Sequence, residues 1–136
     1  MRKRIGVGVA ACCGAVAIAA GIAQAGIPTE IVKDGTGHSG VSLETTWFVG
    51  HLTNPNEKCL PGRKVKISFH YFDESRTRLV DTDRSSSSGE FAGQGPTAHG
   101  DMGPEVDSFH IAVASKNIGT KKHPKICASF QDDFEP

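Results

Sequence analysis

The stretch RKVKISFHYF, Arg63–Phe72, shows the clearest structural pattern in the chain. Apolar and polar residues alternate from Lys64 to Tyr71, which is typical of a β-strand with one buried face and one solvated face. The apolar set is Val65, Ile67, Phe69 and Tyr71, and the polar set is Lys64, Lys66, Ser68 and His70. The sequence therefore predicts a half-buried strand at this point and a packed layer against its apolar face.

Six more segments read as strands, because β-branched and aromatic residues in them are bounded by turn-forming residues. They are residues 29–33 (ended by the dipeptide Asp34-Gly35), 44–52, 78–84, a segment beginning at Phe91, 106–115 and 125–130. Seven strands at a spacing of about 8–15 residues predict an antiparallel seven-stranded two-sheet sandwich of transthyretin or Ig-like type. Residues 93–105 are expected to form a long loop and 131–136 an acidic tail, and the single tryptophan, Trp47, is expected in the core.

Residues 1–25 have the layout of a secretory signal peptide. The basic MRKR precedes an uncharged run of 21 residues, which ends in the cleavage pattern Ala23-Gln24-Ala25. Two alternatives remain open: a retained membrane helix over the same run, and a lipoprotein anchored at Cys12. The favoured organisation is a signal helix over 1–25, followed by one β-sandwich domain over 26–136 that is secreted and possesses no membrane span after cleavage.

Composition limits the function of the chain from Gly26 onward. It holds 12 Lys and Arg against 15 Asp and Glu, a formal net charge of −3. Such a chain has no overall basic excess to attract nucleic acid or an anionic membrane, so neither is expected as a partner. Its 111 residues suit a single domain with a modest core.

Two cysteines, Cys59 and Cys127, remain in the predicted mature chain. An even number of cysteines in an exported protein indicates a disulfide first. A catalytic thiol would need a histidine beside it to lower its pKa, and a zinc site would need closely spaced ligands such as C-x2-C. Neither pattern occurs near these positions, so a Cys59–Cys127 disulfide is predicted.

Several motifs together resemble a known family. They are KCLPGRKVKIS (58–68), LVDTDRSSSSGEF (79–91), GPTAHGD (95–101) and a late KIC (125–127). They are similar to small secreted actinobacterial proteins with the carboxypeptidase regulatory-like domain, a transthyretin-like (prealbumin-like) sandwich, over about Trp47–Phe130. By this resemblance Cys59 and Cys127 match the paired cysteines, Gly89 the turn glycine and Phe91 the aromatic that follows, whereas Ser86 replaces an aspartate. The resemblance implies a scaffold or binding role, with no ligand named.

Candidate chemical residues are few and dispersed. The six histidines are His38, His51, His70, His99, His110 and His123, and no two have the i, i+2 or i, i+4 spacing of a local zinc site. The weak metal candidates are His99 with Asp101 in one loop, and Asp81 with Asp83 on one side of a strand. No G-x-S-x-G elbow frames a serine. The chain also ends QDDFEP, where the transthyretin-like hydrolases end Y-R-G-S.

The sequence therefore predicts a secreted, non-catalytic module that binds an extracellular or cell-envelope partner and needs no cofactor. Its contacts are expected mainly from the loops 93–104 and 53–62, since rigid sheets leave variation to loops. The alternative is a metal-binding or hydrolytic activity built on His99 and Asp101. A third hypothesis is a purely structural protein of the cell envelope.

Overall fold

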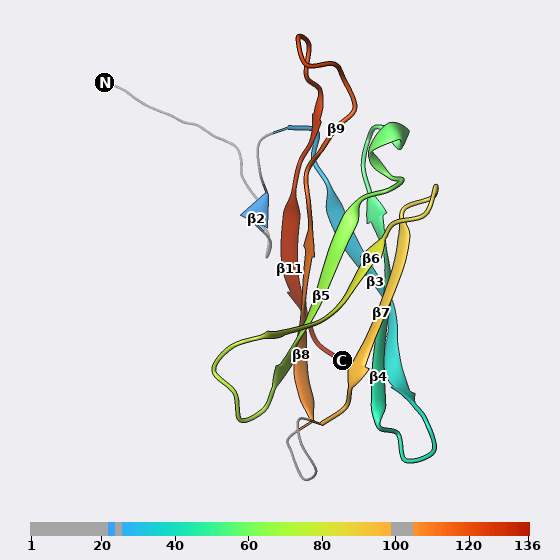
Figure 1. The fold of residues 1–136 in the computed structure, drawn as a ribbon, viewed down its shortest axis with the longest axis vertical. Helices are drawn as coiled ribbons and strands as arrows, with labels where there is room; N and C mark the ends of the chain where they lie inside the picture. Colours follow the sequence, from blue (N-terminus) through green and yellow to red (C-terminus); the bar gives the residue numbers. More distant parts are fainter. Residues whose placement is uncertain (1–21, 24–25, 99–104) are drawn as a thin grey trace, which may run out of the picture.

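Two antiparallel β-sheets face each other in the computed structural model, which describes residues 22–23, 26–98 and 105–136 (Figure 1). The five-stranded sheet has the order β2-β11-β8-β5-β6, and the three-stranded sheet has the order β3-β4-β7. The strands of the first are β2 (Ile22–Ala23), β11 (Phe130–Phe134), β8 (Val106–Val113), β5 (Lys64–Tyr71) and β6 (Arg78–Arg84). Those of the second are β3 (Glu30–Ser39), β4 (Thr45–Thr53) and β7 (Glu90–Pro96). The predicted all-β antiparallel sandwich is confirmed, although its two described sheets contain eight strands where seven were expected.

Shorter elements complete the described part of the chain. A 3-10 turn, η2, spans Glu57–Cys59, and the two-residue strands β9 (Lys116–Asn117) and β10 (Ile126–Cys127) form a small hairpin. No helix in the described residues is long and apolar enough to cross a membrane. Of the predicted signal segment 1–25, only Ile22–Ala23 is described, and it pairs with the start of β11. The rest of that prediction lies outside the described residues.

The core lies between the sheets and follows the alternation of β5. The four predicted inward residues, Val65, Ile67, Phe69 and Tyr71, are at most 1% exposed. The rings of Phe69 and Tyr71 join an aromatic cluster in which Phe109 lies 5.1 Å from Phe69 and 5.3 Å from Phe48 between ring centroids. Offset and edge-on rings at such distances stabilise a core beyond the area they bury. The alternation in the sequence thus identified the buried face of this sheet correctly.

Three boundary predictions were wrong. The pair Asp34-Gly35 does not end its strand but sits at a β-bulge, where the β3–β4 register shifts, and β3 continues to Ser39. A bulge accommodates the extra residue that a turn was expected to absorb. The expected acidic tail is β11, which pairs with β8 over Phe130–Phe134. Likewise, the first residues of the expected 93–105 loop belong to β7.

The predicted core position of Trp47 was also wrong. It lies on the outer face of the three-stranded sheet and is half-buried, because its inward neighbours along β4 are Thr46 and Phe48. Its indole covers Gly35 and Gly37 of β3, and a Cβ at Gly37 would lie 2.5 Å from the ring. Because the two glycines of β3 have no side chains, the indole can lie flat against this strand and stay half-buried outside the core.

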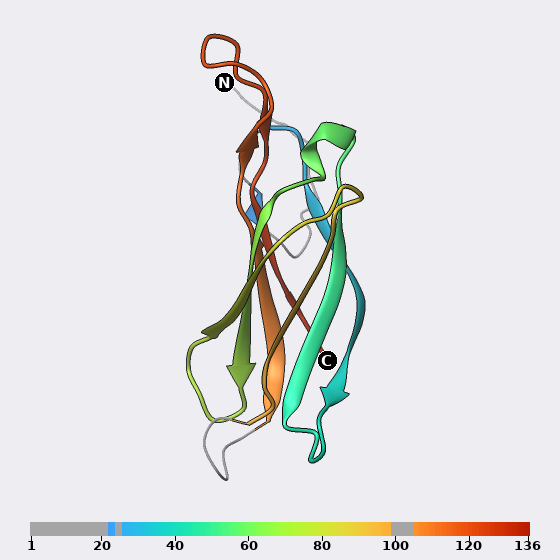
Figure 2. The ribbon, with the colours of Figure 1, turned by 45° about the vertical axis from the view of Figure 1, so that its right-hand side comes forward.

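The loops gather at two opposite ends of the sandwich (Figure 1, Figure 2). The disulfide end contains η2, the β6–β7 turn and the β9–β10 hairpin, joined by the Cys59–Cys127 bond and by the Ser85 hydroxyl, which donates to the Leu60 carbonyl. The turn end contains the β3–β4 turn (residues 40–44), the β5–β6 loop (72–77) and residues 97–98 and 105. The predicted binding loops 53–62 and 93–104 therefore lie at different ends, as far as the latter is described, and do not form one surface.

Candidate functional sites

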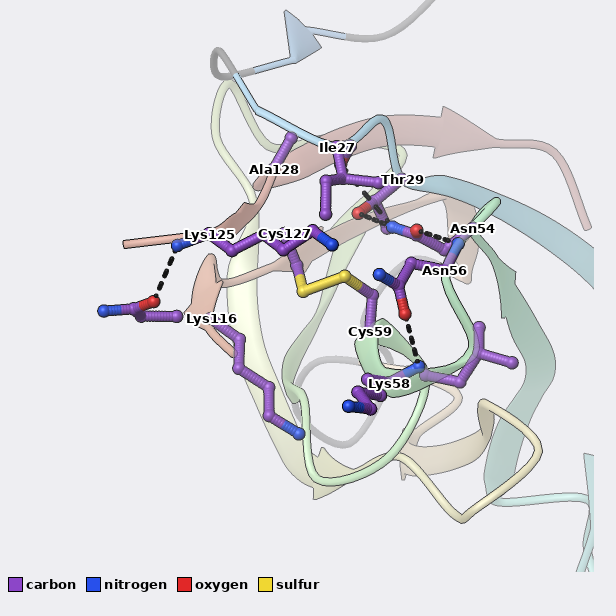
Figure 3. Close-up of a disulfide and its surroundings, with 12 residues drawn as sticks. Ile27, Thr29, Asn54, Asn56, Lys58, Cys59, Lys116, Lys125, Cys127 and Ala128 are labelled. Carbon is purple, nitrogen blue, oxygen red and sulfur yellow. Dashed lines mark hydrogen bonds between the residues drawn. A yellow bond between two sulfur atoms is a disulfide. The ribbon is translucent and has the colours of Figure 1, made fainter. Parts of the chain in front are cut away.

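The disulfide predicted between Cys59 and Cys127 is present, with a Cα–Cα distance of 5.6 Å (Figure 3). Both residues are fully buried. The bond ties η2 to β10, across a sequence separation of 68 residues. No cysteine of the described residues is free, so this part of the chain offers no thiol for catalysis or metal binding.

Beside the disulfide lies a buried cation that the sequence reasoning missed. The Arg63 side chain is 1% exposed, and each of its five N–H groups donates a hydrogen bond. The acceptors are the carbonyls of Cys59, Ala114 and Ala128 and the Thr29 hydroxyl, at 2.7–3.3 Å. Burial lowers the pKa of the guanidinium, which nevertheless stays charged.

Arg63 is therefore a structural centre rather than a binding residue, because its donors are fully used inside the protein. Its hydrogen bonds connect four segments: the residue before β3, η2, the residue after β8 and the link between β10 and β11. Its only sequence signal was the position directly before the alternating strand, where a basic residue reads as solvated.

Asp81 and Asp83, which the sequence suggested as weak metal candidates, have a structural role. One carboxylate oxygen of Asp81 accepts from the Gln94 N–H at 3.0 Å, and one of Asp83 accepts from the Ala92 N–H at 2.9 Å. These amides belong to the edge of β7 that does not pair with β4. The two aspartates of β6 thus close one side of the sandwich by satisfying an edge strand of the opposite sheet.

Three histidines form separate pairs with carboxylates. The Nδ1 atoms of His51, His70 and His110 lie 2.8, 3.2 and 2.7 Å from Asp34, Asp107 and Asp133. His70 and His110 sit on adjacent strands of the five-stranded sheet, where His110 is opposite Ser68. Within the described residues no three His, Cys, Asp or Glu side chains converge as a metal site would require. His99 and Asp101 lie outside the described residues.

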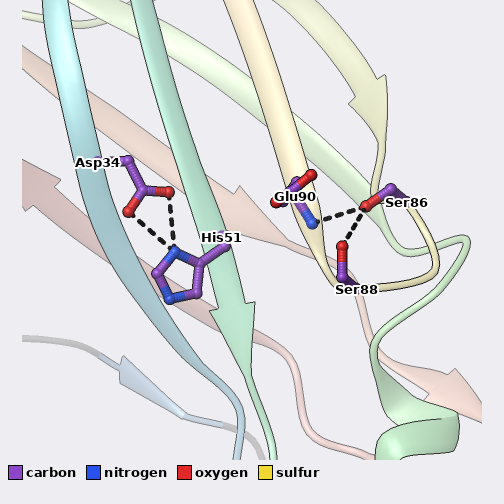
Figure 4. Close-up of polar contacts among 5 residues, drawn as sticks. All are labelled: Asp34, His51, Ser86, Ser88 and Glu90. Atoms are coloured by element: carbon purple, nitrogen blue, oxygen red, sulfur yellow. Dashed lines mark hydrogen bonds and ion pairs between the residues drawn. The ribbon is translucent and has the colours of Figure 1, made fainter.

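A shallow groove of about 450 Å³ runs between the outer face of the three-stranded sheet and the β6–β7 turn. Charged residues including Asp34 and Glu90 rim it, and Val49 and Ala92 are part of its apolar lining. Figure 4 shows its polar groups: Asp34 is engaged by His51, and the Ser86 hydroxyl accepts from the Glu90 N–H at 3.0 Å.

Ser86 therefore makes a local hydrogen bond within the β6–β7 turn. Gly89 in the same turn has φ +89°, and Phe91 is 4% exposed. Within the part of the chain that the structure describes, the Ser86 hydroxyl otherwise contacts Ser88 at 3.2 Å and no histidine that could activate it.

The β3–β4 turn is held by a chain of hydrogen bonds whose direction can be assigned. The Thr97 hydroxyl donates to the Leu43 carbonyl at 2.7 Å, so it accepts from the Thr46 hydroxyl at 2.9 Å. Thr46 in turn accepts from Nδ1 of His38 at 3.0 Å, which requires a proton on that nitrogen. The Thr46 hydroxyl is buried and already donates a hydrogen bond. The hydrogen-bond chain therefore positions the turn and does not activate a nucleophile.

The same turn presents apolar side chains to solvent. Val41 is fully exposed and Leu43 is 58% exposed. Leu43 has φ +55°, a left-handed conformation that is unfavourable for a leucine. The Leu43 N–H donates to the Gly40 carbonyl at 3.2 Å, and the Glu44 carboxylate accepts from the Ser42 N–H at 2.9 Å. The turn is thus built to hold both side chains outward, at a backbone cost of about 1–2 kcal/mol.

Phe72 is a third exposed apolar side chain at the turn end, on the β5–β6 loop. It is 61% exposed, and its N–H donates to the Glu105 carbonyl at 3.2 Å. Exposed acidic residues outnumber basic ones here: Glu44, Asp73 and Glu105 are exposed, and the β5–β6 loop adds one exposed arginine, Arg76. The turn end therefore combines apolar tips with negative charge.

Comparison with known proteins identifies no relative: no protein-family model, no curated protein and no solved structure matches the chain.

Proposed function

We propose that the protein is a secreted, non-catalytic module of the carboxypeptidase regulatory-like, transthyretin-like type that binds an extracellular or cell-envelope protein through its turn end. The observation that carries the proposal is the strained, hydrogen-bonded β3–β4 turn, which keeps Val41 and Leu43 in solvent. Strained backbone held in place by its surroundings is typical of functional surfaces. The fully buried disulfide is compatible with an extracellular location.

The chemistry of the turn end favours a particular kind of partner. Exposed Val41 and Leu43 on the β3–β4 turn suit an apolar pocket, and the exposed acidic residues of the turn end suit a basic rim. The same acidic residues would be repelled by an anionic membrane. A prearranged turn also loses little conformational entropy when it binds, which favours affinity from a small contact area.

The decisive variant is Val41→Ser with Leu43→Gly. Glycine adopts the left-handed conformation without strain, so this variant removes both side chains while the turn keeps or gains stability. The matched control is Val32→Ser, which removes an apolar side chain that is 37% exposed on the face of β3.

The immobilised wild-type protein is expected to retain a partner from culture medium and cell-wall extract, which the purified partner then confirms by calorimetry. Two buried apolar anchors at about 1.5–3 kcal/mol each predict a loss of affinity of roughly 100-fold or more in the double variant. The Val32→Ser control should bind like wild type. Equal retention by all three proteins would refute the proposed binding surface.

A further inference from the structure

The β9–β10 hairpin carries an unbalanced positive charge. Residues 115–126 hold four lysines, Lys116, Lys121, Lys122 and Lys125, and no acidic residue occurs between Asp107 and Asp132. The chain from Gly26 has a net charge of −3, so the remainder without this hairpin carries −7. A near-neutral composition therefore conceals a strongly segregated charge distribution.

The hairpin projects beyond the sheets at the disulfide end (Figure 1, Figure 2). The side chains of Lys121, Lys122 and Lys125 are exposed, and none of them forms an ion pair within the described part of the chain. Lys116 is half-buried and donates from Nζ to the Pro61 carbonyl at 2.6 Å. Three lysines are thus directed into solvent with no carboxylate partner to neutralise them.

This hairpin is prearranged rather than loose. The Asn117 side-chain oxygen accepts from the N–H groups of Gly119 and Lys125 at 2.9 and 3.0 Å. Across the tip, the Thr120 N–H donates to the His123 carbonyl, and the His123 N–H donates to the Thr120 hydroxyl. A Cβ at residue 119 would collide with the His123 carbonyl oxygen, so only glycine permits this closure. The disulfide through Cys127 anchors the base.

We infer that this hairpin is a second binding surface, independent of the turn end, for a linear polyanion of repeated phosphate groups. Lysine binds phosphate as a point charge on a flexible stem, which tolerates the variable spacing of charges along a polymer. The hairpin contains no Phe, Tyr or Trp and none of the exposed large apolar side chains of the described residues. It therefore lacks the groups that stack on nucleic-acid bases or enter a lipid interface.

The negative charge of the rest of the protein restricts where a polyanion can bind. The −7 carried elsewhere repels a polyanion from the remaining surface, so contact is confined to the disulfide end. Three free lysines predict a slope of log K against log salt of about −2 to −3. Affinity should consequently fall about 16- to 64-fold between about 50 mM and about 200 mM salt.

The test uses protein secreted by a host that expresses the full chain, and the probe is labelled long-chain inorganic polyphosphate measured by fluorescence anisotropy. The variant Lys121→Gln/Lys122→Gln/Lys125→Gln should lose at least about tenfold in affinity and most of the salt slope. The matched control Lys33→Gln/Lys64→Gln/Lys66→Gln removes the same charge from exposed lysines elsewhere and should stay within about twofold of wild type. Circular dichroism and thermal melting confirm that both variants fold.

Equal losses in the two variants, or no binding of polyphosphate by the wild type at low salt, would overturn the inference. Tighter binding to polyglutamate, or to vesicles of phosphatidylglycerol and phosphatidylcholine, would overturn the assignment to a phosphate polymer. The Val41→Ser/Leu43→Gly variant should bind polyphosphate like wild type. A failure of the turn-end proposal and a failure of this one are therefore distinguishable.

Discussion

Removing the Cys59–Cys127 cross-link should cost the protein a large share of its stability. The bond closes a loop with a sequence separation of 68 residues. In the chain-entropy treatment, a loop of this length raises the free energy of unfolding by about 4 kcal/mol, because the cross-linked unfolded chain has fewer conformations. Domains of this kind have total stabilities of roughly 5–15 kcal/mol, so the loss should be easily measured.

The assay is equilibrium urea denaturation of the protein from Gly26 onward, comparing wild type with Cys59→Ala/Cys127→Ala. The unfolded state of the variant is more expanded, so the slope of unfolding free energy against urea should also increase. Wild type unfolded and refolded in a phosphine reductant keeps both sulfur atoms and serves as the control that separates the cross-link from packing. If the reduced protein loses less than about 1 kcal/mol, the loop-entropy reasoning is wrong.

Three other residues give independent tests. Arg63→Met should destabilise the protein by about 3–5 kcal/mol in urea denaturation, since buried carbonyls lose their donors, and a loss below about 1 kcal/mol would contradict the proposed structural role. Tyr71→Phe removes the hydroxyl that donates to the Pro96 carbonyl at 2.7 Å and should cost about 1 kcal/mol in the same assay. The backbone N–H groups of Glu44 and Ser42 lower the pKa of the Glu44 carboxyl, so its bond to the turn persists above the unfolded-state pKa and is lost as pH falls through the folded value. NMR should show the Ser42 amide shift titrating in that acidic range in wild type but not in Glu44→Gln.

The sequence predicted the fold class well because the fold rests on local patterns. The alternation in β5 reports directly which side chains face the core, and turn residues mark most strand ends. The parity of the cysteines also sufficed to predict the disulfide, since Cys59 and Cys127 were the two cysteines left after residue 25.

The errors occurred where pairing across the sheet overrode local composition. QDDF looks like a solvated tail, yet β8 supplies hydrogen bonds to it, His110 pairs with Asp133, and Phe134 packs 5.5 Å from Phe48 between ring centroids. The spacing of Phe130 and Phe134 on one face was the signal available for this strand. Trp47 was misassigned because its shelter is provided by glycines of another strand.

The sequence by itself determined the class of fold, the half-buried strand after Arg63 and the pairing of Cys59 with Cys127, because alternation, turn residues and cysteine number act locally or by count. Only the tertiary structure decided the uses of the polar groups. In the folded protein Asp81 and Asp83 accept hydrogen bonds from an edge strand, and Arg63 lies in the interior. An acidic, apolar end and a cationic hairpin lie at opposite ends of the sandwich. Such assignments depend on which distant backbone groups the folded chain brings within hydrogen-bonding distance, and no local pattern encodes that.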